Sequence, residues 1–238
     1  MSILMDPDTP NFFWKNIDAS MDMDCIIESE IPEISPAERI EAISVVGRNG
    51  ELHESFGDYA AYDLTIPKIT IPYERLQEVK NWLRGRGQLV THNDSDKYRD
   101  CICSMGKEKE FENEIGVFYI FSVTFRCQPF RRKLNDRPIP FNKGILNFTD
   151  PGDEVASPYL EIAATGGDFT LTIGDRSLKV LNASAGKVSI DTELGKILQG
   201  TKNLFSIGEW PEISPGDNQL ITSGAMKQGF IQRRSLFL

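Results

Sequence analysis

The sequence predicts a mainly β protein, a β-rich α+β fold with one helix and two domains. Three observations indicate this class: a long alternating apolar run near residues 117–127, one segment with helical spacing after Pro72, and many short apolar runs separated by glycine turns beyond residue 145. The 238 residues, 40% hydrophobic and 26% charged, are typical of a soluble globular chain long enough to bury a substantial core.

One helix is expected in the N-terminal half. Residues 59–71 are extended and β-branched, and Pro72 then stands where proline suits a first helical position. Apolar side chains recur at helical spacing up to Leu83, and Gly85 or Gly87 supplies a left-handed cap. The helix is therefore predicted to end near residue 84.

A long antiparallel hairpin follows the helix, over residues 98–127, with the polar segment 107–114 as its tip. Alternation in its second strand is typical of a half-buried strand, because successive side chains point to opposite faces. The residues predicted to share one face, and to form a candidate assembly hairpin, are Val117, Tyr119, Phe121, Val123 and Phe125.

The C-terminal half reads as a β-sandwich of short strands. Its turn signals are Gly166-Gly167, Gly174-Asp175, Ala185-Gly186, Gly195 and Gly216-Asp217. Residues 130–144 hold two prolines and little periodicity, which is typical of a linker or crossover. The predicted boundaries are an N-terminal β domain at 1–134, a linker at 135–144 and a sandwich at 145–238, with the last strand, 229–238, returning to the N-terminal domain.

The stretch Gly47-Arg48-Asn49-Gly50 raises the question of a phosphate-binding loop. It lacks the Lys-Ser/Thr pair of a P-loop and precedes a strand-like segment, not a helix. Asn-Gly between extended segments is a strong signal for a two-residue hairpin turn. We therefore interpret Gly47, Asn49 and Gly50 as a structural turn and predict no cofactor site.

No catalytic or metal site is predicted. The two histidines, His53 and His92, lie in different segments, and no GxSxG sequence accompanies them. Cys101 and Cys103 share a strand face, but a hairpin centred near residues 110–111 places Cys127 opposite Asp94, so the cysteines are interpreted as reduced core residues. A carboxylate pair of a hydrolase has no local signature among the 35 acidic residues.

The net charge indicates which classes of binding partner are unsuited to this chain. The net charge of −9 and the absence of a long basic cluster argue against specific nucleic-acid binding, although an acidic wall suits a conduit past which DNA slides. The N-terminus shows no signal peptide, and no run is long enough to cross a membrane, so folding in a cytosol without membrane insertion is expected.

The order of motifs resembles phage distal tail proteins, which are tail-tip hub components of long, non-contractile tails. The resemblance rests on PAERIEAISVVGRNGEL, AYDLTIPKI, WLRGRGQLVTHNDSDKYR and VTFRCQPF in the first half, and on NFTDPGDEVASPYLEIAATGGDFTLTIGD, VSIDTELGKIL and EWPEISPGDNQL in the second. Val46 and Asn49 depart from the proline and aspartate more usual in that family.

This resemblance implies a non-enzymatic protein: an N-terminal domain that assembles into a hexameric ring and a C-terminal galectin-like β-sandwich outside it. It also implies a tail-tube protein on one face, a central hub or tail-associated protein on the other, and receptor-binding or baseplate proteins on the sandwich, in a virion tail tip assembled in the host cytoplasm. The alternative is a module that binds host cell-wall carbohydrate, with Trp210 as the candidate sugar contact, although a tryptophan before a proline is more often a packing plug.

Overall fold

The computed structural model describes residues 6–103 and 110–238, and the chain divides into two units. The first comprises Met1–Leu134 with Leu238, and the second comprises Asn135–Phe237. Each unit has its own hydrophobic core. No helix in the described part of the chain has the length and apolar character needed to cross a bilayer.

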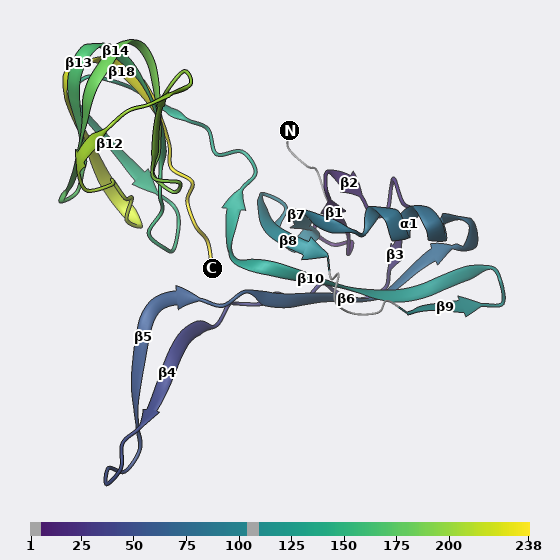
Figure 1. Cartoon of the computed structure of the whole chain (residues 1–238). Coiled ribbons are helices and arrows are strands. Elements are labelled where there is room, and N and C mark those ends of the chain that lie inside the picture. The colour runs from purple at the N-terminus through teal and green to yellow at the C-terminus, as the bar shows by residue number, and fades with distance from the viewer. Residues whose placement is uncertain (1–5, 104–109) are drawn as a thin grey trace. The chain divides into compact units, whose positions relative to one another are not determined.

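The first unit is built on an eight-stranded antiparallel sheet in the order β2-β1-β7-β8-β10-β6-β3, with β9 paired to β10 (Figure 1). Its strands are β1 (Phe12–Trp14), β2 (Ile17–Asp18), β3 (Ile26–Ile27), β6 (Tyr62–Pro72), β7 (Gly85–Thr91), β8 (Lys97–Cys103), β9 (Phe111–Glu114) and β10 (Phe118–Lys133). β4 (Glu38–Ser44) and β5 (Glu51–Tyr59) form a separate two-stranded sheet.

The predicted helix is present as a 3-10 turn, η1 (Tyr73–Arg75), followed by α1 (Leu76–Trp82). A second 3-10 turn, η2 (His92–Asp94), lies between β7 and β8. The helix is held against β1 by two reciprocal bonds, because the indole of Trp14 donates to the Trp82 carbonyl at 3.1 Å and the indole of Trp82 donates to the Trp14 carbonyl at 3.0 Å. Both polar indole atoms are thus satisfied inside the core.

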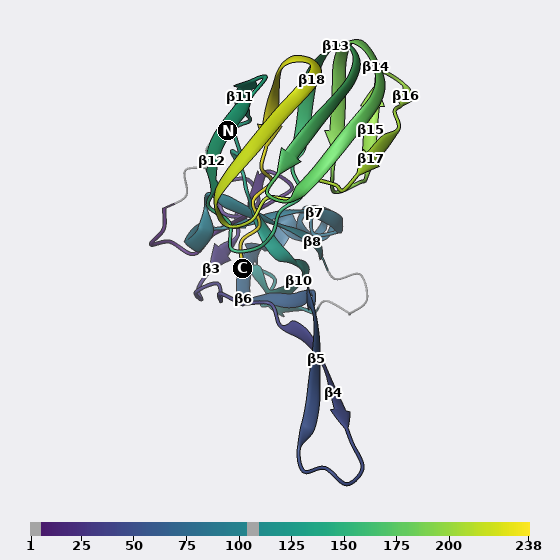
Figure 2. The ribbon, with the colours of Figure 1, turned by 90° about the vertical axis from the view of Figure 1, so that its left-hand side faces the viewer.

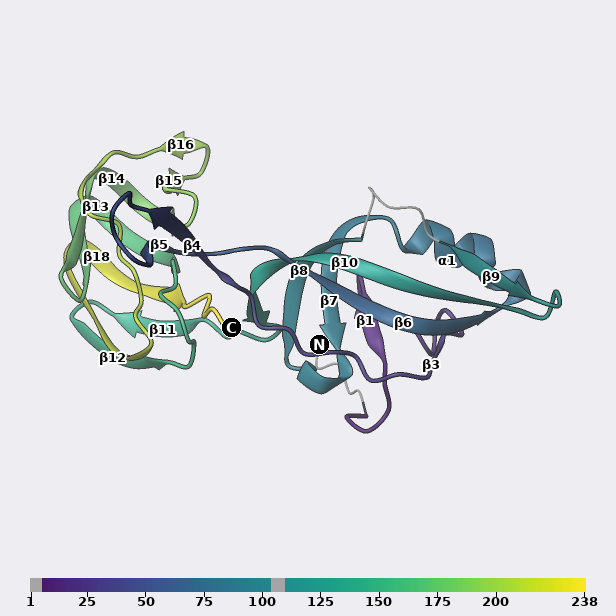
Figure 3. The ribbon, with the colours of Figure 1, turned by 90° about the horizontal axis from the view of Figure 1, so that it is seen from below.

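β6 and β10 run side by side along the first unit (Figure 3). Alternation along β10 buries Phe121, Val123 and Phe125 in the core, whereas Ser122 and Arg126 are exposed on the opposite face. The sheet therefore has one covered face and one open, polar face, as expected of an antiparallel sheet.

The predicted hairpin differs at its tip. The turn lies at residues 115–117, because Glu114 pairs with Phe118, so β9 occupies half of the segment expected to be polar loop. Val117 is in this turn and exposed, not on the buried face of the strand. Residues 107–109 of the predicted tip lie outside the described residues.

The second unit is one eight-stranded antiparallel sheet in the order β11-β18-β13-β14-β15-β16, with β12 paired to β18 and β17 to β14 (Figure 2). Its strands are β11 (Ile139–Asn142), β12 (Ile145–Asp150), β13 (Tyr159–Ile173), β14 (Arg176–Asp191), β15 (Lys196–Gln199), β16 (Lys202–Asn203), β17 (Ser206–Gly208) and β18 (Gly216–Gln232).

Three of these strands are much longer than the sequence predicts. Gly166-Gly167 is not a turn between strands but an irregularity inside β13, where the register shifts. Buried positions are even-numbered before it, at Leu160 and Ile162, and odd-numbered after it, at Phe169 and Leu171. This irregularity bends the strand and keeps both halves facing one core, which lets a single sheet curl over itself.

Ala185-Gly186 likewise lies within β14, and Gly186 pairs with Ala164. Gly174-Asp175 is the two-residue turn expected, joining Ile173 to Arg176. Residues 229–238 were predicted to return to the N-terminal domain. For residues 229–232 this prediction is wrong, because this end of β18 pairs with β11 and β13 in the second unit.

Candidate interaction surfaces

The cysteines are packing residues in the first core. All four are buried. The predicted register was wrong, because Cys127 pairs with Cys101 and not with Asp94, and their Sγ atoms are 2.9 Å apart. That hydrogen bond and burial raise the pKa of Cys101, and burial raises the pKa of Cys25 to about 12, so these thiols are poor nucleophiles and poor metal ligands at neutral pH.

The histidines have separate surroundings. His53 is exposed on β5, whereas His92 is buried on η2 with its Nε2 3.1 Å from a Glu30 carboxylate oxygen. Among the described residues, no cluster of three or more Cys, His, Asp or Glu side chains forms a metal site.

A buried ion network ties the segment before β4 to the first sheet. Arg99 is fully buried, and its Nη2 donates to both Glu33 carboxylate oxygens at 3.1 and 3.2 Å. Its other donors reach the Tyr62 hydroxyl and the Thr91 hydroxyl, each at 3.1 Å. Arg131 also donates to Glu33 at 2.6 Å, so one carboxylate fixes the root of the β4–β5 hairpin.

The stretch 47–50 joins β4 to β5, so it connects two strands as expected. The connection is a loop of residues 45–50, not a two-residue turn. Gly47 and Gly50 have φ values of +83° and +82°, whereas Asn49 is not among the residues with positive φ. The loop feeds a strand and no helix, so it lacks the geometry of a phosphate-binding loop.

The β4–β5 hairpin is exposed along its length. Every residue from 38 to 57 is exposed. Large apolar side chains are included in this surface, among them Val46 at 102% and Phe56 at 68% exposure, together with Ile40, Ile43, Val45 and Leu52. Apolar side chains of this number on an isolated ribbon mark an interaction element.

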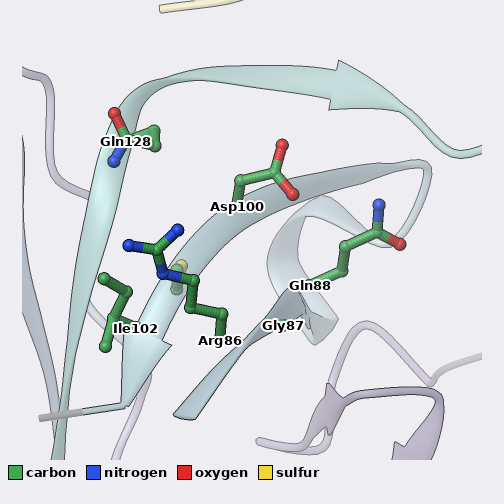
Figure 4. A pocket seen from close by; sticks show the side chains of 7 residues that line it. Arg86, Gly87, Gln88, Asp100, Ile102 and Gln128 are labelled. Atoms are coloured by element: carbon green, nitrogen blue, oxygen red, sulfur yellow. The ribbon is translucent and has the colours of Figure 1, made fainter. Parts of the chain in front are cut away.

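A hollow of about 400 Å³ lies on the open face of the first sheet, between β7, β8 and β10 (Figure 4). Arg86 and Gln88 come from β7, Asp100 and Ile102 from β8 and Gln128 from β10. In the described part of the chain, the Arg86 guanidinium has no carboxylate within ion-pair distance.

The candidate site residues predicted from the sequence lie mostly in or against the two cores. Phe121, Val123 and Phe125 are core residues, and Tyr119 is half-buried against the same core. Trp210 is half-buried against the core of the second unit, where a packing plug would lie. Sequence reasoning did not identify Arg99 or the exposed hairpin, although Arg99, Cys101 and Cys103 share one strand face and arginine in such company is a recognisable signal.

The fold of this chain is similar to that of a solved phage distal tail protein. The crystal structure of the SPP1 Dit (gp 19.1) protein, described as a paradigm of the hub adsorption apparatus in phages infecting Gram-positive bacteria, superimposes with a TM-score of 0.71. The match covers 94% of this chain and 99% of that chain at 10% sequence identity, so it shows a shared fold over both units. No family model matches the sequence, and no curated protein matches it.

Proposed function

We propose that this chain is a structural component of the tail tip of a long-tailed bacteriophage. In this role it forms a hexameric ring that joins the tail tube to the central hub or tail-associated protein, and DNA passes through the lumen. The observation that carries the proposal is the whole-chain likeness to SPP1 Dit, which covers 94% of this chain and therefore both units. The net charge of −9 supports a wall that does not retain DNA.

The second unit is proposed as a galectin-like sandwich that carries receptor-binding or baseplate proteins. Its support is the curled sheet together with exposed apolar side chains at its β17 edge, namely Ile207 on β17 and Phe205 just before it. The chain has no catalytic step in this role, and its place is the virion tail tip after assembly in the host cytoplasm.

Antibody labelling of virions tests the proposal. An antibody raised against the second unit is expected to label the tail tips of the parent phage in negative-stain images, and a nonsense mutation in the gene is expected to abolish complete tails. Label on the capsid, or virions that lack the protein and still have complete tails, would contradict the assignment.

The alternative function is that of a module that binds cell-wall carbohydrate. The feature that favours it is a hollow in the second unit, and not Trp210. A hollow of about 420 Å³ in the second unit is lined by Tyr159 and Phe230, with Glu161 and Gln232 beside them. Aromatic rings with neighbouring carboxylate and amide groups suit a sugar ring. Loss of glycan binding in Phe230→Ala, with an unchanged melting temperature, would support this alternative, and unchanged binding would exclude this hollow.

A further inference from the structure

The β4–β5 hairpin, residues 38–59, requires a partner surface for physical reasons. A two-stranded hairpin alone is marginally stable in water, because it has no core to bury its apolar side chains. β4 and β5 pair only with each other, within the described residues. A partner that covers the exposed apolar side chains would stabilise the ribbon.

One face of the hairpin has a distinctive charge arrangement. Glu41 lies directly opposite Glu54, and Ile43 lies directly opposite Leu52. These four side chains share a face, because residues two apart on a strand point the same way. Like charges directly opposite each other are destabilising, and neither carboxylate is paired with a cation in the described structure. This face therefore calls for a surface that offers a cation beside an apolar group.

The same chain carries such a surface. Arg86 is exposed at the hollow on the open face of the first sheet, and half-buried Ile102 lies next to it (Figure 4). The pairing sets two unpaired carboxylates and two aliphatic side chains on the hairpin against an unpaired guanidinium and an aliphatic side chain in the hollow, which Asp100 also lines. The hairpin as a whole is also acidic, with five carboxylates against two arginines between residues 38 and 59.

We infer that the hairpin docks on a second copy of this chain, with Glu41 and Glu54 against Arg86 and with Ile43 and Leu52 against Ile102. The contact is heterologous, since the hairpin of one copy meets the sheet of the next, and such contacts close into a ring when the rotation allows. This inference rests on the proposed ring and names the surfaces that join its subunits.

Charge reversal with rescue tests the contact. Full-length Glu54→Arg and Arg86→Glu are each expected to weaken self-assembly at least about tenfold, measured by light scattering across a concentration series. The double variant restores opposite charges and is expected to recover most of the assembly. Glu51→Arg is the matched control, because it makes the same charge change on the opposite face of the same strand and is expected to assemble like the wild type.

Cross-linking adds a readout that does not depend on stability. Chains carrying Leu52→Cys and chains carrying Ile102→Cys are mixed under mild oxidation, and a disulfide-linked dimer of the two is expected. The four native cysteines are buried and give little background. Wild-type chains that assemble while the reversals have no effect and no cross-link forms would overturn the inference and leave the ring standing. Wild-type chains that stay monomeric at every concentration, together with cysteine variants that form no cross-link, would overturn it too. Labelling of tail tips decides the proposed function separately.

Discussion

The ion network around Glu33 permits a prediction whose size follows from the structure. Glu33→Gln keeps the volume of the side chain but removes the charge that faces fully buried Arg99. Arg99 would retain its bonds to the Tyr62 and Thr91 hydroxyls, so it would be underpaired without being stripped of every partner.

The expected magnitude is about 2–3 kcal/mol of the free energy of unfolding. Breaking a buried ion pair costs about 3–5 kcal/mol when an unpaired charge remains. Here the cost is reduced, because the Glu33 side chain is 48% exposed and Asp94 also contributes negative charge near Arg99. Glu30→Gln is the control, since the Glu30 side chain is 78% exposed beside His92 and its loss should cost less than about 0.5 kcal/mol.

Urea unfolding followed by tryptophan fluorescence measures this difference. Trp14 and Trp82 report on the first unit, and a Trp210→Phe background removes the signal of the second unit. The midpoint is expected to fall clearly for Glu33→Gln and hardly at all for Glu30→Gln. Equal, small losses in both variants would refute the reasoning that Glu33 neutralises the buried guanidinium.

Three further predictions concern the cores and the second unit. Phe125→Ala should destabilise the first unit by about 3–5 kcal/mol, because the ring is fully buried with its centroid 4.9 Å from that of Trp14. The same urea titration measures this loss, with Thr124→Ala on the open face as the control. A loss no greater than that of the control would contradict the place of Phe125 in the core. The bidentate pair between Arg234 and Asp191 lowers the pKa of Asp191, so its stabilisation is present above the ordinary aspartate pKa and is lost as pH falls through the lower folded value. Melting temperatures of wild type and Asp191→Asn should therefore differ at pH 7 and converge towards about pH 2, and parallel curves would show that the pair is not the source. In native protein at pH 8, none of the four thiols should react with a thiol-specific chromogenic disulfide until urea is added, because burial raises the pKa of Cys25 to about 12 and hides the other three thiols. Rapid release of one equivalent of the chromophore from native protein would contradict the burial of the thiols.

Local patterns in the sequence were sufficient for the elements whose neighbours are close in the chain. The alternation of Phe121, Val123 and Phe125 identified a half-buried strand, and Pro72 marked the start of the helical segment. Both signals arise from steric and burial preferences that act within one element.

Features that depend on distant pairing were missed. The glycine pair at 166–167 reads as a turn, but pairing with β14 and β18 on both sides keeps it inside one long bent strand. Cys101 pairs with Cys127 because the register between β8 and β10 is centred beyond the expected tip, and β9 lies within a segment read as polar loop. Arg99 is buried because Glu33 supplies its counter-charge from 66 residues away, and no local pattern encodes such a contact.

The β4–β5 surface could not be predicted from the sequence, because its residues come together only in the folded hairpin. Glu41 and Glu54 become a pair when β4 and β5 are placed in register, and the register needs the loop at 45–50 to be longer than the two-residue turn that Asn49-Gly50 indicates. Binding surfaces of this kind are assembled from side chains that have no characteristic spacing in sequence.

The most direct test of the central claim is the solution mass of the purified full-length chain by light scattering, with negative-stain images of the same peak. The proposed tail-tip role predicts a mass six times the 26.8 kDa of one chain and six-fold rings with a central hole. A strict monomer at every concentration, alone and mixed with the tail-tube and hub proteins encoded beside it, would contradict the ring.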